Sequence, residues 1–221
     1  MLTLYYNPGS CSLASHAALE EAGLDYCLEK VDLSIGANEH ADYRARNPWG
    51  RVPALEIDGA ILTENVAILS YIADRVPERR LLPPAGSLLR VRALEWLALL
   101  SSTVHIAFRP IFRPNRLAES EEAQRDVTTL GLKSLNRTLT LVEQRLGAGP
   151  YALGDTISVC DLYLFVFALW SRRPVLIGRL DPLPLLDAFG DRLATRPSVQ
   201  AALAGEGLNW PPRIQQTDAP R

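Results

Sequence analysis

The chain has 221 residues and a formal net charge of −2, with 23 Lys and Arg against 25 Asp and Glu. This balance, with a pI of about 6.0, excludes the basic footprint that nucleic-acid binding needs. No uninterrupted apolar run reaches the roughly 18 to 20 residues that span a membrane, and the N-terminus lacks the pattern of a secretory signal. We therefore expect a cytoplasmic protein that has neither a nucleic-acid nor a membrane partner.

The cysteines argue for the same compartment. There are three, Cys11, Cys27 and Cys160, an odd number of residues that lie far apart in the sequence. This is not the pattern of a disulfide framework, and no Cys-x-x-Cys or Cys/His spacing indicates a metal site. We therefore expect no metal cofactor.

The first 76 or so residues alternate between strand and helix. An apolar strand at 2–6 leads through a turn at 7–10 into a helix that begins at Cys11 and ends at Gly23. A second strand at 26–31 follows, and then a polar loop that contains a short helix around 40–46. The pair Asp58-Gly59 joins two short apolar runs and predicts a hairpin, after which a helix opens at 63–65. The predicted order is β-α-β-α-β-β-α.

The rest of the chain is helical in pattern. A Pro-rich segment separates the two parts, so we predict an α/β domain at 1–77, a linker at 78–87, an all-helical domain at 88–208 and a tail at 209–221. The first helix runs from Leu88 to about Ile106, and Pro110 is expected to kink or end the helical path. We expect residues 205–221 to pack on the surface or fray. The other predicted helices cover 119–146, 158–172, 183–193 and 199–203.

Cys11 is the first candidate functional residue. It lies where a strand turns through Pro8-Gly9 into a helix, so free backbone N–H groups and the helix dipole favour negative charge there. A thiol in that position is expected to ionise more readily, and the thiolate is its reactive form. The alternative is a small buried apolar cysteine.

Two further features lie near the end of the first domain. Val52-Pro53 precedes a strand. A cis peptide bond there would expose the Val52 backbone to an extended ligand, but an ordinary strand-entry proline is the favoured interpretation. Thr63-Glu64-Asn65 opens a helix, and capping by Thr63 or Asn65 is the favoured interpretation. The functional alternative has Glu64 bind an ammonium group while free N–H groups hold a carboxylate, which suits an amino-acid headgroup.

The helical part offers one candidate for chemistry and one for folding. His105 is either a partly buried residue bonded to a helix carbonyl or a proton donor and acceptor that titrates near neutral pH. Ser158 and Asp161 have capping-box spacing, which is a folding signal. Trp170 and its aromatic neighbours at helical spacing indicate core.

Together these segments resemble the cytosolic glutathione transferase superfamily, and most closely its bacterial Beta class. The resemblance covers the chain to about residue 208. It implies a thioredoxin-like N-terminal domain joined to an all-α helical bundle domain. The matching segments are 6–16, 47–55, 62–68, 105 with 108–114, and 157–164.

The resemblance implies roles for the candidate residues. Cys11 corresponds to the Beta-class cysteine beside the glutathione sulfur, with His105 as its partner from the helical domain and Ser10 as a nearby hydroxyl. Val52 would pair its backbone with the cysteinyl part of glutathione, and Pro53 would be cis.

At the other end of the ligand, Glu64 and Asn65 would hold the γ-glutamyl group, and Arg51 would meet the glycyl carboxylate. The implied co-substrate is glutathione, the implied second substrate is a hydrophobic electrophile, and the implied assembly is a homodimer.

Several positions depart from the family pattern. Asn65 replaces a common serine, Arg51 a common glutamine and Trp49 a common lysine. Ala98 and Ile106 replace an asparagine and a lysine, and the loop at Ile35 lacks a lysine. Each of these changes removes a polar contact to the ligand. Each lost hydrogen bond is worth roughly 0.5 to 1.5 kcal/mol, so weaker glutathione binding is expected.

The sequence therefore predicts an enzyme, a glutathione transferase that conjugates glutathione to electrophilic small molecules, with thiol–disulfide exchange or peroxide reduction as a further activity of the same site. Two alternatives stay open. One is a non-catalytic binding protein that keeps the fold, and the other is a glutathione-dependent isomerase or dehalogenase.

Overall fold

The first strand of the chain lies inside a four-stranded mixed sheet of order β2-β1-β3-β4. The computed structural model describes residues 1–211. β1 (Leu2–Tyr6) pairs in parallel with β2 (Tyr26–Lys30) and antiparallel with β3 (Ala54–Ile57). β4 (Ala60–Thr63) follows β3 through the predicted Asp58-Gly59 hairpin, where both residues have positive φ.

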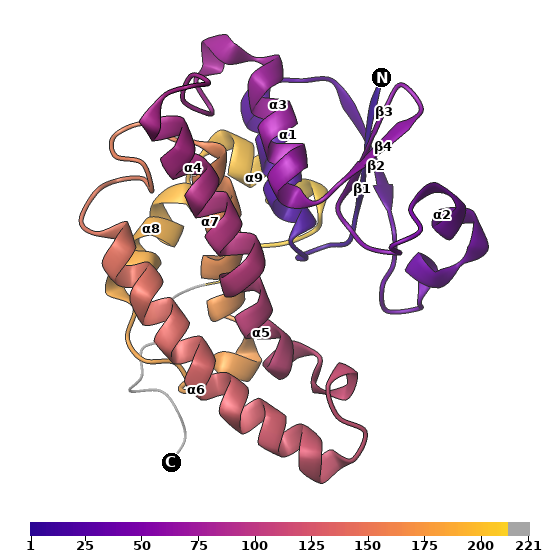
Figure 1. The fold of residues 1–221 in the computed structure, drawn as a ribbon, viewed down its shortest axis with the longest axis vertical. Helices are drawn as coiled ribbons and strands as arrows, with labels where there is room; N and C mark the ends of the chain where they lie inside the picture. Colours follow the sequence, from indigo (N-terminus) through magenta and orange to yellow (C-terminus); the bar gives the residue numbers. More distant parts are fainter. Residues whose placement is uncertain (212–221) are drawn as a thin grey trace.

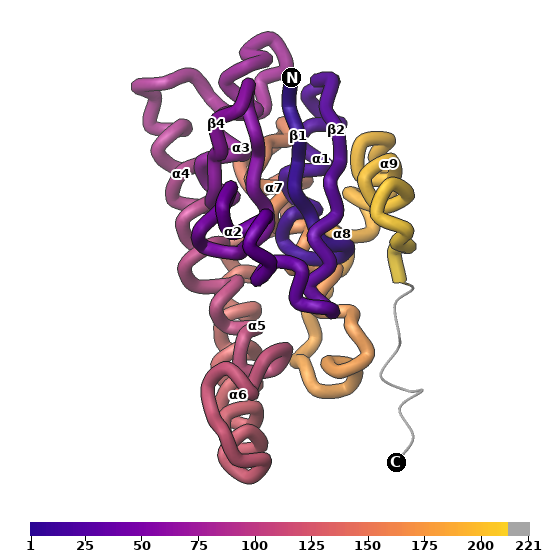
Figure 2. The backbone as a smooth tube through the Cα atoms, turned by 90° about the vertical axis from the view of Figure 1, so that its right-hand side faces the viewer, coloured from indigo at the N-terminus to yellow at the C-terminus, as the bar shows by residue number. Residues whose placement is uncertain are grey.

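Helices cover both faces of this sheet. α1 (Ser12–Ala22) and α3 (Asn65–Arg75) lie on one face, and the short α2 (Ala41–Arg46) lies on the other (Figure 2). On the α2 side a small cluster of Tyr5, Val31, Tyr43 and Ala54 forms a local core. The arrangement confirms the predicted thioredoxin-like α/β domain.

The C-terminal domain is helical, as predicted, and its centre is α7 (Val159–Ser171), every residue of which is buried from 159 to 170. α7 packs against α1, α4 and α8, so one continuous hydrophobic core runs from the sheet into the helical domain (Figure 1). The other helices are α4 (Leu88–Leu99), α5 (His105–Phe112), α6 (Glu121–Leu146), α8 (Pro184–Ala194) and α9 (Pro197–Gly205).

The first long helix differs from the prediction. It is interrupted by a π-helical turn, Leu100–Val104, and Pro110 neither ends nor breaks α5, which continues to Phe112. Gly131 of α6 provides the space for Pro110, because a Cβ at Gly131 would lie 2.3 Å from the Pro110 Cβ. The close approach of α5 and α6 accommodates the proline that was expected to end the helical path.

The same interrupted helix is also the most apolar long segment of the described chain. Within residues 1–211, Leu88–Phe112 is the one helix long and apolar enough, by length and composition, to cross a membrane, and 39% of its most apolar window is buried. A core helix of a globular protein passes the same test. Here α4 contacts α3 and α7, and α5 contacts α6, so the segment is part of the helical domain.

The predicted capping box at the start of α7 is confirmed. The Ser158 N–H and Oγ–H both donate to Asp161 Oδ2 at 2.8 Å, and the Ala152 N–H donates to Oδ1 at 2.7 Å. Burial raises the pKa of Asp161 to about 6, against the effect of these bonds.

The end of the chain also differs from expectation. Glu206 is 6% exposed and bonded inside the protein, so it is neither frayed nor on the surface. Trp210 stacks on Phe165 with 4.9 Å between ring centroids and lies against Gly190 of α8. Residues 212–221 of the predicted tail lie outside the described residues, and the domain limits at 77, 88 and 208 stay predictions.

Candidate active site

The candidate site begins in the loop between β1 and α1. Ser10 N–H bonds the Asn7 carbonyl at 3.0 Å, and the first N–H groups of α1 bond back to Ser10 and Cys11. Among described residues, the Cys11 N–H has no other acceptor and points at its own sulfur. The predicted set of free N–H groups is therefore reduced to one.

Cys11 lies at the N-cap of α1 and is 8% exposed. Its Sγ–H donates to the Val52 carbonyl at 3.5 Å, and its own carbonyl accepts from Asn65 Nδ2 at 2.9 Å. Burial raises the pKa of the thiol to about 12, and the carboxylates of Glu64 and Glu206 add to this. The prediction of a readily ionised thiol was wrong, because burial outweighs the helix start.

The Ser10 hydroxyl is part of a small network within the loop. Ser10 Oγ lies 2.7 Å from Ser12 Oγ, and Ser12 Oγ lies 3.3 Å from the Asn7 carbonyl. A carbonyl only accepts, so Ser12 donates to Asn7 and Ser10 donates to Ser12 in the arrangement that satisfies both bonds. Ser10 therefore holds the loop in shape.

The helical domain clamps the residue that precedes Ser10. The Gly9 carbonyl accepts from Trp170 Nε1 at 2.9 Å and from Arg173 Nη2 at 2.6 Å, and the Gly9 N–H donates to Glu206 Oε2 at 2.8 Å. Gly9 has φ 65°, a left-handed conformation that suits glycine. The sequence reasoning missed these three partners because they lie far along the chain and none carries a local signal.

The backbone before β3 lies beside Cys11. Val52-Pro53 is cis, as the resemblance implied. The Arg51 carbonyl is held by the Tyr43 hydroxyl at 2.6 Å and Asn47 Nδ2 at 2.8 Å, whereas the Arg51 side chain is exposed. This loop is fixed by its backbone and leaves a guanidinium free at the surface.

The start of α3 differs from a capped helix. Glu64 is the N-cap residue with φ 68°, no side chain caps the helix, and the Glu64 carboxylate is exposed. Such a backbone conformation carries roughly 1–3 kcal/mol of strain and clusters at functional sites. The side chain of Asn65 is buried: its Nδ2 donates to the Cys11 carbonyl, and its Oδ1 accepts from Ser15 Oγ at 2.8 Å. The favoured capping interpretation was therefore wrong for both Thr63 and Asn65.

His105 comes from the helical domain, directly after the π-helical turn. Its ring meets Trp170 edge-on with centroids 5.2 Å apart, and no described residue bonds its nitrogens. Burial lowers its pKa to about 4, and the charges of Arg109 and Arg51 add to this. Of the two alternatives for His105, the one that has it titrate near neutral pH is contradicted, and the imidazole is neutral at pH 7.

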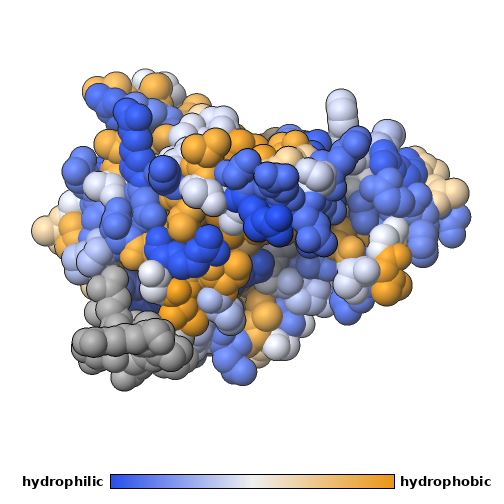
Figure 3. Space-filling view, turned by 90° about the horizontal axis from the view of Figure 1, so that it is seen from below, coloured by the Kyte–Doolittle hydropathy of each residue, from blue (hydrophilic) through white to orange (hydrophobic). Residues whose placement is uncertain are grey.

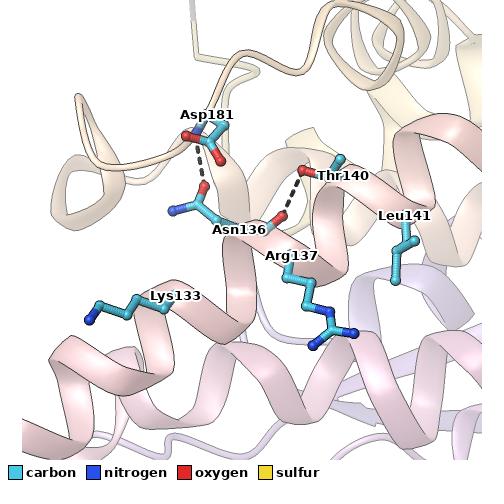
Figure 4. Close-up of a pocket in the computed structure, with 6 residues that line it drawn as sticks. All are labelled: Lys133, Asn136, Arg137, Thr140, Leu141 and Asp181. Carbon is cyan, nitrogen blue, oxygen red and sulfur yellow. Dashed lines mark hydrogen bonds between the residues drawn. The ribbon is translucent and has the colours of Figure 1, made fainter.

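Two hollows lie away from Cys11. One, of about 450 Å³, lies along α6 and beside Asp181, whose N–H donates to Asn136 Oδ1 at 2.7 Å (Figure 4). The other, of about 650 Å³, lies between the linker at Leu82–Ala85 and the segment before α7. Neither contains a predicted site residue, and within residues 1–211 no His, Cys, Asp and Glu side chains cluster as a metal site.

A sheet with this order, a helix started by cysteine, a cis-proline and a helical domain behind it define a thioredoxin-like protein with a glutathione transferase architecture. Residues 1–74 match the family described as "Glutathione S-transferase, N-terminal domain", and residues 109–206 match "Glutathione S-transferase, C-terminal domain". The chain belongs to the glutathione S-transferase family.

Relatives support this over nearly the whole chain. It is 41% identical to the glutathione S-transferase GstA of Escherichia coli O157:H7 over 94% of this chain and 100% of that protein. A sphingomonad glutathione S-transferase complexed with glutathione is 41% identical, with a TM-score of 0.81 over 94% of this chain and all of the other. The Beta-class enzyme of Sphingomonas chungbukensis is 40% identical with the same TM-score and the same coverage of both chains.

Proposed function

We propose that this protein is a glutathione transferase that conjugates the sulfur of glutathione to hydrophobic electrophiles in the cytoplasm. The observation that carries the proposal is the meeting of two helix starts. The N-terminus of α1 with Cys11 and the N-terminus of α3 with Glu64 flank the Val52 backbone. A tripeptide that has a zwitterionic end and a thiol matches this arrangement: the zwitterionic end suits the start of α3, the peptide backbone suits Val52, and the thiol suits the start of α1.

The γ-glutamyl end would bind at α3. The Glu64 carboxylate is exposed and has no hydrogen-bond partner among described residues, so it suits an ammonium group. The uncapped N–H groups at the start of α3 suit a carboxylate. The Asn65 side chain is bonded to α1, so it makes no contact with the ligand in this proposal. Asn65 would instead bind the ligand through its backbone N–H, and its side chain would hold the Cys11 backbone in position.

The rest of the ligand would follow the loop before β3. The Val52 backbone would pair with the cysteinyl unit, with Pro53 holding the direction of the chain, and the exposed Arg51 guanidinium would meet the glycyl carboxylate. In this arrangement the glutathione thiol would lie beside Cys11 and Ser10, with His105 on the side of the helical domain.

The chemistry would use the thiol of glutathione as the nucleophile. The Cys11 thiol, with its pKa raised to about 12, is protonated at neutral pH and can donate a hydrogen bond to a neighbouring thiolate. The glutathione thiol releases its proton to solvent, because His105, with its pKa lowered to about 4, is too weak a base to hold that proton at neutral pH. The thiolate then attacks an electrophilic carbon held near Phe112, which is half-buried at the end of α5.

Calorimetry with glutathione and a conjugation assay with chlorodinitrobenzene test the proposal. We expect binding and turnover in the wild type, and conjugation that survives Cys11→Ala while glutathione-dependent disulfide reduction is lost. Glu64→Gln is expected to raise the KM for glutathione about ten-fold, because a charged hydrogen bond is removed. Absence of both binding and turnover would instead favour a non-catalytic binding protein, in line with the apolar, exposed Trp49, Ile35 and Ile106.

A homodimer is the proposed assembly. α4 exposes an apolar stripe at helical spacing, in which Leu88 is 72%, Val91 58% and Leu94 40% exposed. Contiguous apolar surface of this kind marks an interaction site in a globular protein. Sedimentation of Val91→Glu and of an exposed control, Gln144→Glu, measures this: only the first is expected to give monomers, and a wild-type monomer would overturn the assembly.

A further inference from the structure

The electrophile side of the site is surrounded by arginines without carboxylate partners. Arg109 lies one helical turn after His105 on α5, and Arg113 lies at the end of the same helix. Both side chains are exposed, and neither side chain has a hydrogen bond or an ion pair with any described residue. His105, Arg109 and Arg113 follow one another at four-residue spacing, so they lie along one face of α5.

The charges of these arginines affect the pKa values of two nearby side chains, His105 and Arg173. The charged groups that influence His105 are Arg109 and Arg51, and the charged group that influences Arg173 is Arg113. In both cases the pKa falls, by burial first and then by the like charge, and no acidic side chain offsets the effect. The field at this face is therefore positive and uncompensated.

The same residues have aromatic surfaces between them. The Arg173 guanidinium lies over Phe112 at 4.8 Å and over Trp170 at 5.5 Å from the ring centroids, and Trp170 also contacts His105. Seen from below, the molecule has hydrophilic and hydrophobic side chains mixed over its surface, and both kinds border a hollow (Figure 3). A flat apolar ring and a negative group fit this combination.

The carboxylates near Cys11 do not cancel the positive charge. Glu206 is buried, and its Oε2 accepts a hydrogen bond from the Gly9 N–H. The other carboxylate oxygen, Oε1, lies 3.1 Å from Nδ1 of His16. Glu64 lies at the start of α3, where the proposed site uses it for the ammonium group of glutathione. The electrophile side keeps Arg109, Arg113 and Arg173.

We propose that the second substrate is an anionic aromatic electrophile, such as a halogenated nitrobenzoate, whose ring packs on the half-buried Phe112 while its carboxylate binds Arg109 and Arg113. This inference rests on the proposed transferase function. The glutathione thiolate attacks the carbon that carries the halogen, the C–S bond forms, and the halide leaves with the electrons of the C–halogen bond. The thiol proton goes to solvent, and the substrate carboxylate is unchanged.

A matched pair of electrophiles tests the preference. Chlorodinitrobenzene and chlorodinitrobenzoate have the same leaving group, and each enzymatic kcat/KM is divided by the uncatalysed rate constant with glutathione. We expect a larger acceleration for the benzoate. Arg109→Gln and Arg113→Gln are each expected to lower kcat/KM for the benzoate about ten-fold, the effect of one charged hydrogen bond, and to change the value for the neutral compound less than about two-fold.

Two controls separate the alternatives. Arg137→Gln removes an exposed arginine of α6, in the hollow of Figure 4. This variant is expected to leave kcat/KM unchanged for both compounds. The KM for glutathione, measured in each variant, reports whether Arg109 or Arg113 binds the tripeptide instead.

The outcomes are distinct. A wild type that conjugates neither compound overturns the proposed transferase function. A wild type that conjugates chlorodinitrobenzene without a gain for the benzoate overturns only the anion preference. An equal loss on both compounds, or a raised KM for glutathione in the Arg109 or Arg113 variants, also overturns it.

Discussion

A thiol at the start of a helix experiences two opposing effects. The helix dipole and a free N–H favour the thiolate, and each is worth about 0.3–1 kcal/mol at such a position. Transfer into an interior that is nearly closed to water favours the neutral thiol by several times as much. For Cys11, bonded to Val52 and shielded by the helical domain, the second effect is larger.

The first prediction concerns the reactivity of the three cysteines. Cys27 is exposed on β2, whereas Cys11 and Cys160 are buried with their pKa raised to about 12. We expect iodoacetamide at pH 7.5 to label Cys27 first and Cys11 more than about a hundred-fold more slowly, because only the thiolate reacts. Peptide mass spectrometry follows the labels, and Cys27→Ser is expected to stay unlabelled at early times. Early labelling of Cys11 would contradict the prediction.

The second prediction concerns His105. Its pKa in the folded protein is about 4, below the 6.5 of the unfolded chain, because of burial and then of Arg109 and Arg51. Between these two values the unfolded chain binds a proton that the native protein does not, so unfolding becomes easier as the pH falls. The stability from this group is present above about pH 6.5 and is lost as the pH falls towards 4.

Urea unfolding at a series of pH values measures this effect. From pH 7 to 4.5 the wild type is expected to lose more of its free energy of unfolding than His105→Gln, which has no proton to bind at that position. The acidic groups titrate equally in both proteins, so the comparison isolates the imidazole. Equal pH slopes would show that His105 is accessible to protons in the folded state.

At the scale of the element, α5 and α6 approach one another through Pro110 and Gly131. Thr128 Oγ1 also contacts the Pro110 carbonyl at 3.3 Å and bonds its own helix at Gln124. A helix normally gains about 1 kcal/mol when Gly is replaced by Ala. At Gly131 the new Cβ would lie 2.3 Å from the Pro110 Cβ, a distance that forces the helices apart.

The third prediction is that Gly131→Ala destabilises the protein by about 1–3 kcal/mol, the range for overpacking in a core. Pro110→Ala combined with Gly131→Ala is expected to recover part of this loss, because the ring is removed. Ser134→Ala, an exposed position of the same helix, serves as the control for helix propensity. A gain in stability for Gly131→Ala in thermal unfolding would show that α5 and α6 can separate without loss.

The elements themselves were largely predictable from the sequence, because their signals are local. Asp58-Gly59 predicted the hairpin, Gly23 predicted the end of α1, and the pair Ser158 and Asp161 predicted the start of α7. The π-helical turn before His105 was not predictable: Ser102 Oγ bonds the Ala98 carbonyl at 2.8 Å, a local competition that the apolar pattern does not reveal.

The candidate site was predictable only in part. The resemblance brought Cys11, Val52, Glu64 and His105 together, but the sequence does not encode burial directly, so the predicted pKa direction of Cys11 was wrong and the lowered pKa of His105 was not predicted. The side-chain direction of Asn65 depends on Ser15, a partner that lies on another helix.

At the scale of the whole molecule, a polar seam joins the two domains. Glu206, which follows α9, bonds Gly9 and lies beside His16 of α1, while Arg196 forms an ion pair with Glu21 of α1. The side chains of His16 and Glu206 are 1% and 0% exposed. Removing one member of a buried pair leaves the other uncompensated, which typically costs about 3–5 kcal/mol.

The seam also connects stability to the site, since Gly9 precedes Ser10 and Cys11. The fourth prediction is that Glu206→Gln lowers the free energy of unfolding by about 2–4 kcal/mol and raises the KM for glutathione, because a neutral amide serves Gly9 and His16 less well. Glu122→Gln, exposed on α6, is the matched control and is expected to change neither value. Urea unfolding and steady-state kinetics measure both. A loss of stability with an unchanged KM would mean that the loop keeps its shape without Glu206, and that the seam joins the domains without positioning the site.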